Sequence, residues 1–215
     1  MRLPQLLADA RACTTCAAHL PHEPRPLLQA APSSRILIIG QAPGAAAHAS
    51  AIPWDDRSGH RLRDWLALTP EQFYDPRLVA LMPMGFCFPG SATNQSGRKA
   101  ADLAPRPECA PQWHPPLLAA LKRIQLTIYI GQYAFARYLA DEFGTITAAA
   151  RAFTTLLPTR LALPHPSPRN NLWLQRHPWF EDEAIAAIRT RVRAIAGQPA
   201  PPTTNAQHAA ARTVR

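Results

Sequence analysis

Four short, continuous apolar segments constrain the fold of this chain more than any other feature. They cover residues 35–39, 78–82, 126–130 and 160–163. Apolar runs of this length are typical of parallel strands that are buried on both faces of a sheet. Apolar residues at helical spacing occur in four other segments, residues 61–68, 117–124, 131–142 and 180–196. The alternation predicts an α/β fold with three layers, αβα, around a central, mostly parallel four-stranded sheet, with residues 83–116 as a long loop.

The length of 215 residues suits one domain. We expect residues 1–196 to form this domain, because they contain all of the apolar segments. From Gly197 onward the chain is rich in Pro, Ala, Thr and Gln without apolar periodicity, which predicts a disordered tail over 197–215. Asp9 and Arg11 interrupt the N-terminal segment, and no apolar run approaches the roughly 20 residues of a membrane span. We therefore expect a cytoplasmic monomer without a membrane partner.

The chain is strongly basic. It has 23 Lys and Arg against 14 Asp and Glu, a net charge of +9, and its only lysines are Lys99 and Lys122. Arginine suits bidentate contacts with phosphates, so the charge is consistent with nucleic-acid binding. An Arg-rich composition without any ligand gives the same charge, and charge alone does not separate the two.

Three of the predicted strands end in unusual loops. Residues 40–44 (Gly-Gln-Ala-Pro-Gly) follow the first strand, residues 83–87 the second, and residues 165–170 (His-Pro-Ser-Pro-Arg-Asn) the fourth. Ligands of open α/β sheets lie beyond the carboxyl ends of the strands, so these loops could converge on one pocket. The prolines hold the loop around His165 stiff, which suits preorganised chemistry. A simple tight turn and a capped loop histidine are the alternatives.

Several function classes lack their motifs in this chain. Residues 40–44 do not form the Gly-x-Gly-x-x-Gly fingerprint of dinucleotide-binding enzymes, and they lack the lysine of a phosphate-binding P-loop. The Gly-x-Ser-x-Gly elbow of serine hydrolases is also absent. The sequence therefore argues against a Rossmann oxidoreductase, a P-loop nucleotide-binding protein and a serine hydrolase.

The two loops together resemble the motifs of the uracil-DNA glycosylase superfamily. Residues 40–44 resemble motif A, especially that of the iron–sulfur family 4 enzymes. Residues 165–170 are similar to motif B and close to its form in single-strand-selective uracil glycosylases. Ile52-Pro53-Trp54 falls where family 4 has a Gly-x-Pro-Phe segment whose aromatic ring stacks on the flipped base. The resemblance covers roughly residues 10–190 and implies a uracil-DNA-glycosylase-like fold.

This resemblance implies a DNA glycosylase that hydrolyses the N-glycosidic bond of uracil or a related deaminated base, with damaged DNA as its partner. It implies that His165 donates a hydrogen bond to O2 of the leaving base and that Gln41 helps to position the attacking water. Asp55 or the adjacent Asp56 could orient that water or balance the cationic sugar. Two acids in a solvated turn are the alternative.

Further residues follow from the same resemblance. The expected substrate-binding residues are Gly40, Ala42, Pro43, Gly44, Trp54 and Met82. The expected DNA-binding residues are Ser167, Arg169, Asn170 and Leu172. Ser167 and Arg169 would hold phosphates, and Leu172 or Trp173 would enter the space left by the flipped base. Packing in the core is the alternative for Trp54 and Trp173.

The four cysteines form a candidate ligand set. Cys13 and Cys16 form one Cys-x-x-Cys pair, and Cys87 and Cys109 are far apart in the sequence. Thiolate sets suit Zn²⁺ or an iron–sulfur cluster, and the spacing does not separate these two. The resemblance implies a [4Fe–4S] cluster, because family 4 enzymes have one such pair near the N-terminus and two later cysteines. Four buried free thiols are the alternative.

The chain departs from family 4 at two positions. Gln41 stands where those enzymes usually have Glu, and Met82 stands where they have an Asn that pairs with the uracil edge. A thioether cannot hydrogen-bond a base in that way. A non-catalytic DNA- or lesion-binding protein of the same fold is therefore the alternative function, and an unrelated iron–sulfur or zinc α/β protein is a third.

Overall fold

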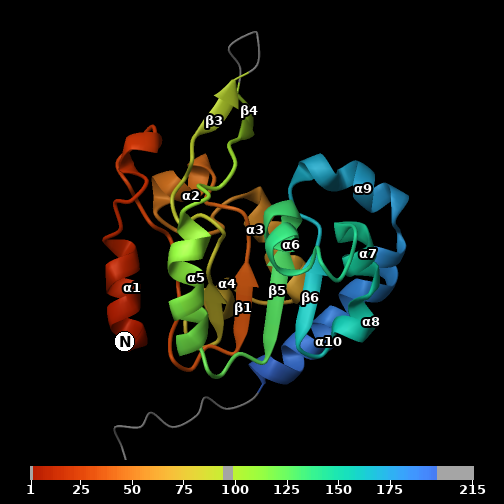
Figure 1. Ribbon diagram of the computed structural model, residues 1–215. Helices are drawn as coiled ribbons and strands as arrows, with labels where there is room; N and C mark the ends of the chain where they lie inside the picture. Colours follow the sequence, from red (N-terminus) through yellow and green to blue (C-terminus); the bar gives the residue numbers. More distant parts are fainter. Residues whose placement is uncertain (1, 94–98, 198–215) are drawn as a thin grey trace, which may run out of the picture.

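The centre of the fold is a parallel sheet of four strands, β2-β1-β5-β6 in spatial order (Figure 1). The strands are β1 (Ile36–Ile39), β2 (Val79–Leu81), β5 (Leu126–Ile130) and β6 (Arg160–Leu163). In this computed structural model, which describes residues 2–93 and 99–197, Ile36 lies opposite both Val79 and Leu126. Every strand lies within one residue of its predicted bounds, so the predicted four-stranded sheet is confirmed.

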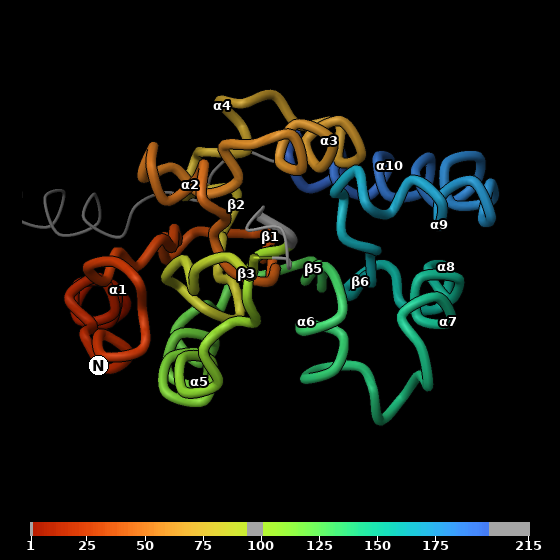
Figure 2. Tube along the Cα trace, turned by 90° about the horizontal axis from the view of Figure 1, so that it is seen from above, coloured from red at the N-terminus to blue at the C-terminus, as the bar shows by residue number. Residues whose placement is uncertain are grey.

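Helices cover both faces of this sheet, which gives the expected three layers (Figure 2). The helices and helical turns are α1 (Leu3–Arg11), η1 (Ala17–His19), α2 (Ala45–Ser50), α3 (Arg57–Leu66), α4 (Pro70–Phe73), α5 (Cys109–Ala120), α6 (Gly131–Tyr138), α7 (Ile146–Arg151), α8 (Phe153–Leu156), η2 (Pro168–Asn170), α9 (Asn171–Arg176), η3 (Phe180–Ala184) and α10 (Ile185–Ala196). Ile36 and Ile38 point toward α3 and α10, whereas Leu37 and Ile39 point toward α1 and α5. This alternation explains why β1 is apolar at every position.

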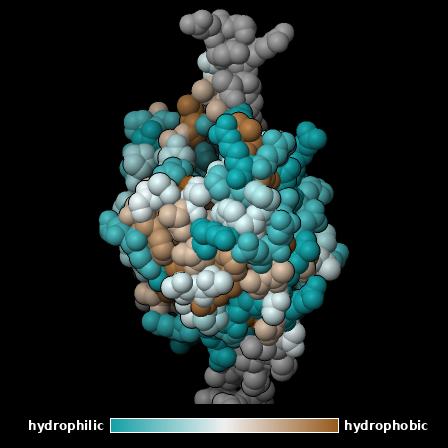
Figure 3. All heavy atoms as spheres, turned by 90° about the vertical axis from the view of Figure 1, so that its right-hand side faces the viewer, coloured by the Kyte–Doolittle hydropathy of each residue, from teal (hydrophilic) through white to brown (hydrophobic). Residues whose placement is uncertain are grey.

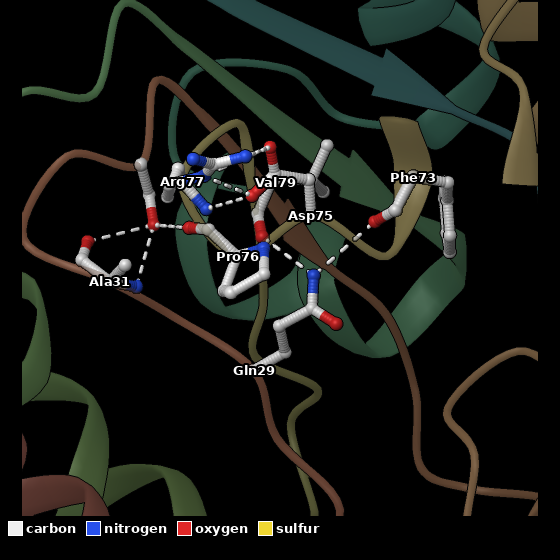
Figure 4. Close-up of polar contacts among 8 residues, drawn as sticks. Gln29, Ala31, Phe73, Asp75, Pro76, Arg77 and Val79 are labelled. Atoms are coloured by element: carbon white, nitrogen blue, oxygen red, sulfur yellow. Dashed lines mark hydrogen bonds and ion pairs between the residues drawn. The ribbon is translucent and has the colours of Figure 1, made fainter. Parts of the chain in front are cut away.

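The segment before β1 protects the outer edge of β2. The backbone of Gln29 exchanges two hydrogen bonds with that of Leu81, at 2.9 and 2.7 Å. The Gln29 side chain also donates to the carbonyl oxygens of Phe73 and Val79, at 3.3 and 2.9 Å (Figure 4). An edge strand whose polar groups are paired does not offer a template to another chain. Close by, the Arg77 guanidinium lowers the pKa of the Asp75 carboxyl.

The prediction of a long loop over residues 83–116 is wrong in part. Within it, β3 (Ser91–Thr93) and β4 (Lys99–Asp102) pair as an antiparallel hairpin that projects above the carboxyl ends of the strands (Figure 1). Helix α5 starts at Cys109 and ends at Ala120, not over 117–124. Pro115 and Pro116 both lie inside α5. His114 belongs to the buried face of this helix, a role that its polar character concealed.

Other predicted bounds shift at helix ends. α3 begins four residues earlier than expected, because the Asp56 side chain accepts a hydrogen bond from the Gly59 backbone and caps the helix. α6 ends at Tyr138 rather than at 142, and the closing segment 180–196 consists of the π-helical turn η3 followed by α10. The predicted tail lies outside the described residues from 198 onward.

The outer surface carries both polar and apolar side chains. The side of the molecule with α7, α8 and α9 shows hydrophilic surface interspersed with smaller hydrophobic areas (Figure 3). None of the helices within residues 2–93 and 99–197 is long and apolar enough to cross a membrane.

His114 is a buried, neutral histidine that fixes the loop after β2. Its Nε2 lies 3.0 Å from the Pro83 carbonyl oxygen, and its Nδ1 lies 2.5 Å from the Tyr138 hydroxyl. A carbonyl oxygen only accepts, so Nε2 carries the hydrogen and Nδ1 accepts from the tyrosine. Burial, above all, lowers the pKa of His114 from 6.5 to about 4. Tyr138 and His114 thereby connect α6 and α5 to the loop at Pro83.

We expect this histidine to make the protein sensitive to acid. Between pH 6.5 and about 4 the unfolded chain protonates His114 while the folded chain keeps it neutral. The contribution of His114 to the free energy of unfolding is therefore fully present above pH 6.5. It is lost as the pH falls toward 4, by about 3 kcal/mol for the full shift. Urea unfolding between pH 7 and 4 measures this slope. In His114→Gln, which preserves a donor and an acceptor without titrating, the slope should be smaller. Equal slopes in both proteins would contradict the prediction.

Candidate active site

One cavity lies at the carboxyl ends of the strands, and all three unusual loops reach it. Its volume is about 610 Å³, a size typical of small-ligand sites. The first loop contributes Gln41, Ala42, Pro43 and Gly44, the second contributes Pro83, and the last contributes His165, Ser167, Arg169 and Asn170. The expected convergence of the three loops on one pocket is confirmed.

His165 is held as a neutral hydrogen-bond donor. The backbone N–H of Ser167 donates to its Nδ1 at 3.3 Å, so in the neutral ring the hydrogen is on Nε2. Burial lowers the pKa of His165, and the negative charges of Asp56 and Asp102 offset this only in part. The Asn170 side chain donates to the His165 carbonyl oxygen at 2.7 Å and stabilises the turn. Position and tautomer of this imidazole are therefore fixed before any ligand enters.

Trp54 forms a wall of the cavity beside His165. The two rings stack with centroids 5.8 Å apart and planes tilted by 27°. A β-carbon added to Gly40 would lie 2.7 Å from Cζ2 of Trp54, and one added to Gly59 would lie 1.8 Å from its carbonyl oxygen. Both glycines therefore leave room for the tryptophan, one beside its ring and one beside its backbone. Trp54 is half-buried, packs on the core and lines the cavity.

The backbone at Trp54 adopts a conformation that a tryptophan rarely takes. Its φ is 59°, in the left-handed region. The Arg63 side chain donates to the Trp54 carbonyl oxygen at 3.3 Å, and the Tyr74 hydroxyl donates to the carbonyl of Pro53 at 3.0 Å. Arg63 is itself buried and bonded to the Tyr74 hydroxyl at 3.2 Å. Such strain is maintained only where the surroundings determine it, as in functional sites.

Two carboxylates line the cavity near Gly44. A β-carbon on Gly44 would lie 3.2 Å from Oδ2 of Asp102 and 3.9 Å from Oδ2 of Asp56. Asp56 caps α3 through its Oδ1, and Asp102 accepts a hydrogen bond from the Ser91 hydroxyl at 3.0 Å through its Oδ1. Both charges act on His165 across the cavity. The sequence predicts one acidic side chain at this site, and the structure brings two, Asp56 and Asp102, into the cavity wall.

Four expected site residues lie outside the cavity wall. Asp55 is exposed, whereas its neighbour Asp56 lines the cavity. Met82 is 3% exposed and packs in the core between the sheet and α1 and α5. Leu172 lies on α9 with 55% of its surface exposed. Gly40 lies behind the ring of Trp54.

Sequence reasoning missed Asp102, Tyr133 and Ser58, which also line the cavity. Asp102 lies in a segment with no periodic pattern, and only the pairing of β3 with β4 brings it to the site. Tyr133 and Ser58 lie in the first turns of α6 and α3, close to the carboxyl edge of the sheet. The Gly-Gln-Tyr sequence after the third strand was the available signal for Tyr133.

All four cysteines line a second, small pocket between the N-terminal segment, the loop at 85–87 and α5. The Trp113 indole N–H donates to the Cys13 sulfur at 3.4 Å, and the Phe86 backbone N–H donates to the Cys109 sulfur at 3.3 Å. Burial raises the pKa of Cys87 to about 11 and that of Cys109 to about 12. Among the residues that the structure describes, no three His, Cys, Asp or Glu side chains are arranged to hold a single metal ion.

Comparison with known proteins shows the family to which this chain belongs. Residues 29–189 match the model of the Uracil DNA glycosylase superfamily, and this range includes every strand of the central sheet and both loops that carry the motifs. A solution NMR structure of a proposed uracil DNA glycosylase from Methanosarcina acetivorans is also similar, with a TM-score of 0.41 and 12% sequence identity over 75% of this chain and 93% of that chain. The chain belongs to the uracil DNA glycosylase superfamily.

Proposed function

We propose that this protein is a DNA glycosylase that hydrolyses the N-glycosidic bond of uracil or a related deaminated base. The observation that carries the proposal is the preorganised Nε2–H donor of His165 in a cavity that both motif loops line. Loss of a pyrimidine base leaves negative charge on its O2 oxygen, and a fixed donor in a partly dehydrated site stabilises that charge. A neutral imidazole serves this purpose without a proton transfer.

The other residues of the cavity support the same reaction. An extruded base would stack on Trp54, and the hydroxyl of Ser167 and the guanidinium of Arg169 would contact neighbouring phosphates. Asp56 takes the place expected for Asp55, because it lines the cavity and faces Gly44. It would orient a water toward C1′ and accept one of its protons. The bond between C1′ and the base nitrogen breaks, the water oxygen binds C1′, and the base leaves as an anion that takes a proton from solvent.

Excision assays test this function directly. The purified protein is incubated with single- and double-stranded oligonucleotides that contain uracil, hypoxanthine or xanthine, and abasic sites are then cleaved with alkali. We expect strand cleavage with at least one of these bases. If none is released while DNA binding is retained, the glycosylase proposal fails, and a non-catalytic lesion-binding protein becomes the better description.

We also propose that Cys13, Cys16, Cys87 and Cys109 hold a [4Fe–4S] cluster. The residues fit such a group, because four thiols reach one pocket and N–H donors already point at two of the sulfurs. The cluster would join the N-terminal segment to the loop at Cys87 and to α5, and its contribution would be structural.

Protein purified without oxygen should contain about four iron and four sulfide per chain. Cys87→Ala should lose most of this iron and should unfold at a lower temperature, because the loop at 85–87 loses its connection to the N-terminal segment and to α5. Iron and sulfide analysis measures the first effect and circular dichroism the second. A protein with zinc and no iron, or with neither metal, would contradict the proposal.

A further inference from the structure

The loop after β2 does not offer a polar side chain for reading a base. Met82 is buried in the core, and Pro83 is the residue through which this loop lines the cavity. The Pro83 carbonyl oxygen already accepts a hydrogen bond from His114. The edge of a bound base must therefore be read by other groups of the wall.

Asp102 has the position and the chemistry for this task. The segment that follows it contacts the motif A loop, because the Gln41 side-chain amide donates to the carbonyl oxygen of Leu103 at 3.5 Å. The Leu103 N–H donates to the Gly90 carbonyl oxygen at 2.9 Å, which fixes the base of the hairpin. The Ser91 hydroxyl donates to Oδ1 of Asp102, and Oδ2 is the oxygen on the side of Gly44. An ionised carboxylate accepts hydrogen bonds and donates none.

We propose that Asp102 is the specificity-determining residue of this site and that it accepts the ring N–H of a deaminated base; this inference rests on the proposed glycosylase function. Deamination of cytosine or adenine turns a ring nitrogen that only accepts into one that carries hydrogen, next to a new carbonyl. His165 would hold a carbonyl oxygen of the base while Asp102 accepts the ring N–H. A carboxylate facing the lone pair of cytosine or adenine would be repelled instead.

The two carboxylates of the cavity then have different functions. Asp56 is fixed by the start of α3, and Asp102 by the β3–β4 hairpin, so the two can be altered independently. Thymine also carries a ring N–H, so Asp102 cannot discriminate thymine from uracil. The exclusion of thymine must come from the shape of the cavity. This gives an internal control, since a change at Asp102 should leave the ratio of the affinity for uracil to the affinity for thymine unaltered.

Binding measurements test the proposal independently of catalysis. Single-stranded oligonucleotides carry uracil, cytosine or thymine on a 2′-fluorinated sugar, which slows bond cleavage, and the lack of a complementary strand removes any difference in unpairing cost. In the wild-type protein, uracil should bind at least about 10-fold more tightly than cytosine. Asp102→Ala should remove most of this preference and preserve the uracil-to-thymine ratio. Asp141→Asn, an exposed acid outside the cavity, is the matched control.

Each outcome decides one question. A preference for uracil over cytosine that Asp102→Ala leaves intact, or a wild-type protein without such a preference, overturns the role of Asp102 even if the enzyme excises uracil. An equal loss of binding for all three bases also overturns it, since Asp102 would then support the cavity rather than read the base. A wild-type protein that prefers uracil through Asp102 but releases no base would contradict the glycosylase function alone.

Discussion

Replacing His165 with Ala should slow the excision step by about 10²–10³-fold, the usual effect of removing one donor from a developing anion. The Nε2–H donor would be lost at the point where negative charge accumulates on the leaving base. DNA binding should change by only a few-fold, because the proposed phosphate contacts come from Ser167 and Arg169. Single-turnover rates measure the chemical step, and a gel-shift assay measures binding.

The pH dependence of the same step separates a neutral donor from a positively charged one, whose contribution would fall as the pH rises. Burial lowers the pKa of His165, so the ring is neutral at pH 7 and becomes charged only as the pH falls below its ordinary range. The His165-dependent part of the rate should therefore stay constant from pH 7 to 8. His60→Ala removes an exposed imidazole outside the cavity and should leave the rate unaltered. A His165→Ala protein with the full wild-type rate would exclude this residue from the mechanism.

The positions of the two motif loops could be predicted from sequence because both depend on strands with a strong apolar signal. β1 and β6 end at Ile39 and Leu163, and the loops follow directly. The carboxyl ends of parallel strands share one edge of the sheet, so topology alone brings residues 40–44 and 165–170 together. The family match confirms the superfamily that these loops indicated.

The acidic side of the cavity could not be predicted in the same way. Whether Asp55 or Asp56 faces the cavity depends on which of them caps α3, and one residue of register decides it. Asp102 reaches the site through a hairpin of two short strands that have no periodic apolar pattern. Met82 is an expected base contact because a motif resemblance fixes a position along the chain and not the direction in which the side chain points.

Replacing Gly59, which lies beside the backbone of Trp54, should have a large effect on stability. Gly59→Ala would place a methyl group 1.8 Å from the Trp54 carbonyl oxygen and 2.7 Å from its carbonyl carbon, so backbone rather than a flexible side chain must move. Alanine gains up to about 1 kcal/mol over glycine inside a helix, but relief of such a clash costs about 3 kcal/mol or more. The clash should therefore prevail, with a melting temperature lower by on the order of 10 °C.

Gly144→Ala is the matched control, since a β-carbon there would meet nothing within 4 Å. It should change stability by no more than about 1 kcal/mol. Thermal unfolding of the two variants compares them directly. Because Arg63 and Tyr74 hold the backbone of residues 53–54 against α3, a displaced Trp54 carbonyl also disturbs the wall on which the base would stack. Gly59→Ala should then lose excision activity even at temperatures where it stays folded. If it is as stable and as active as Gly144→Ala, the close contact between Gly59 and Trp54 is not a feature of the protein in solution.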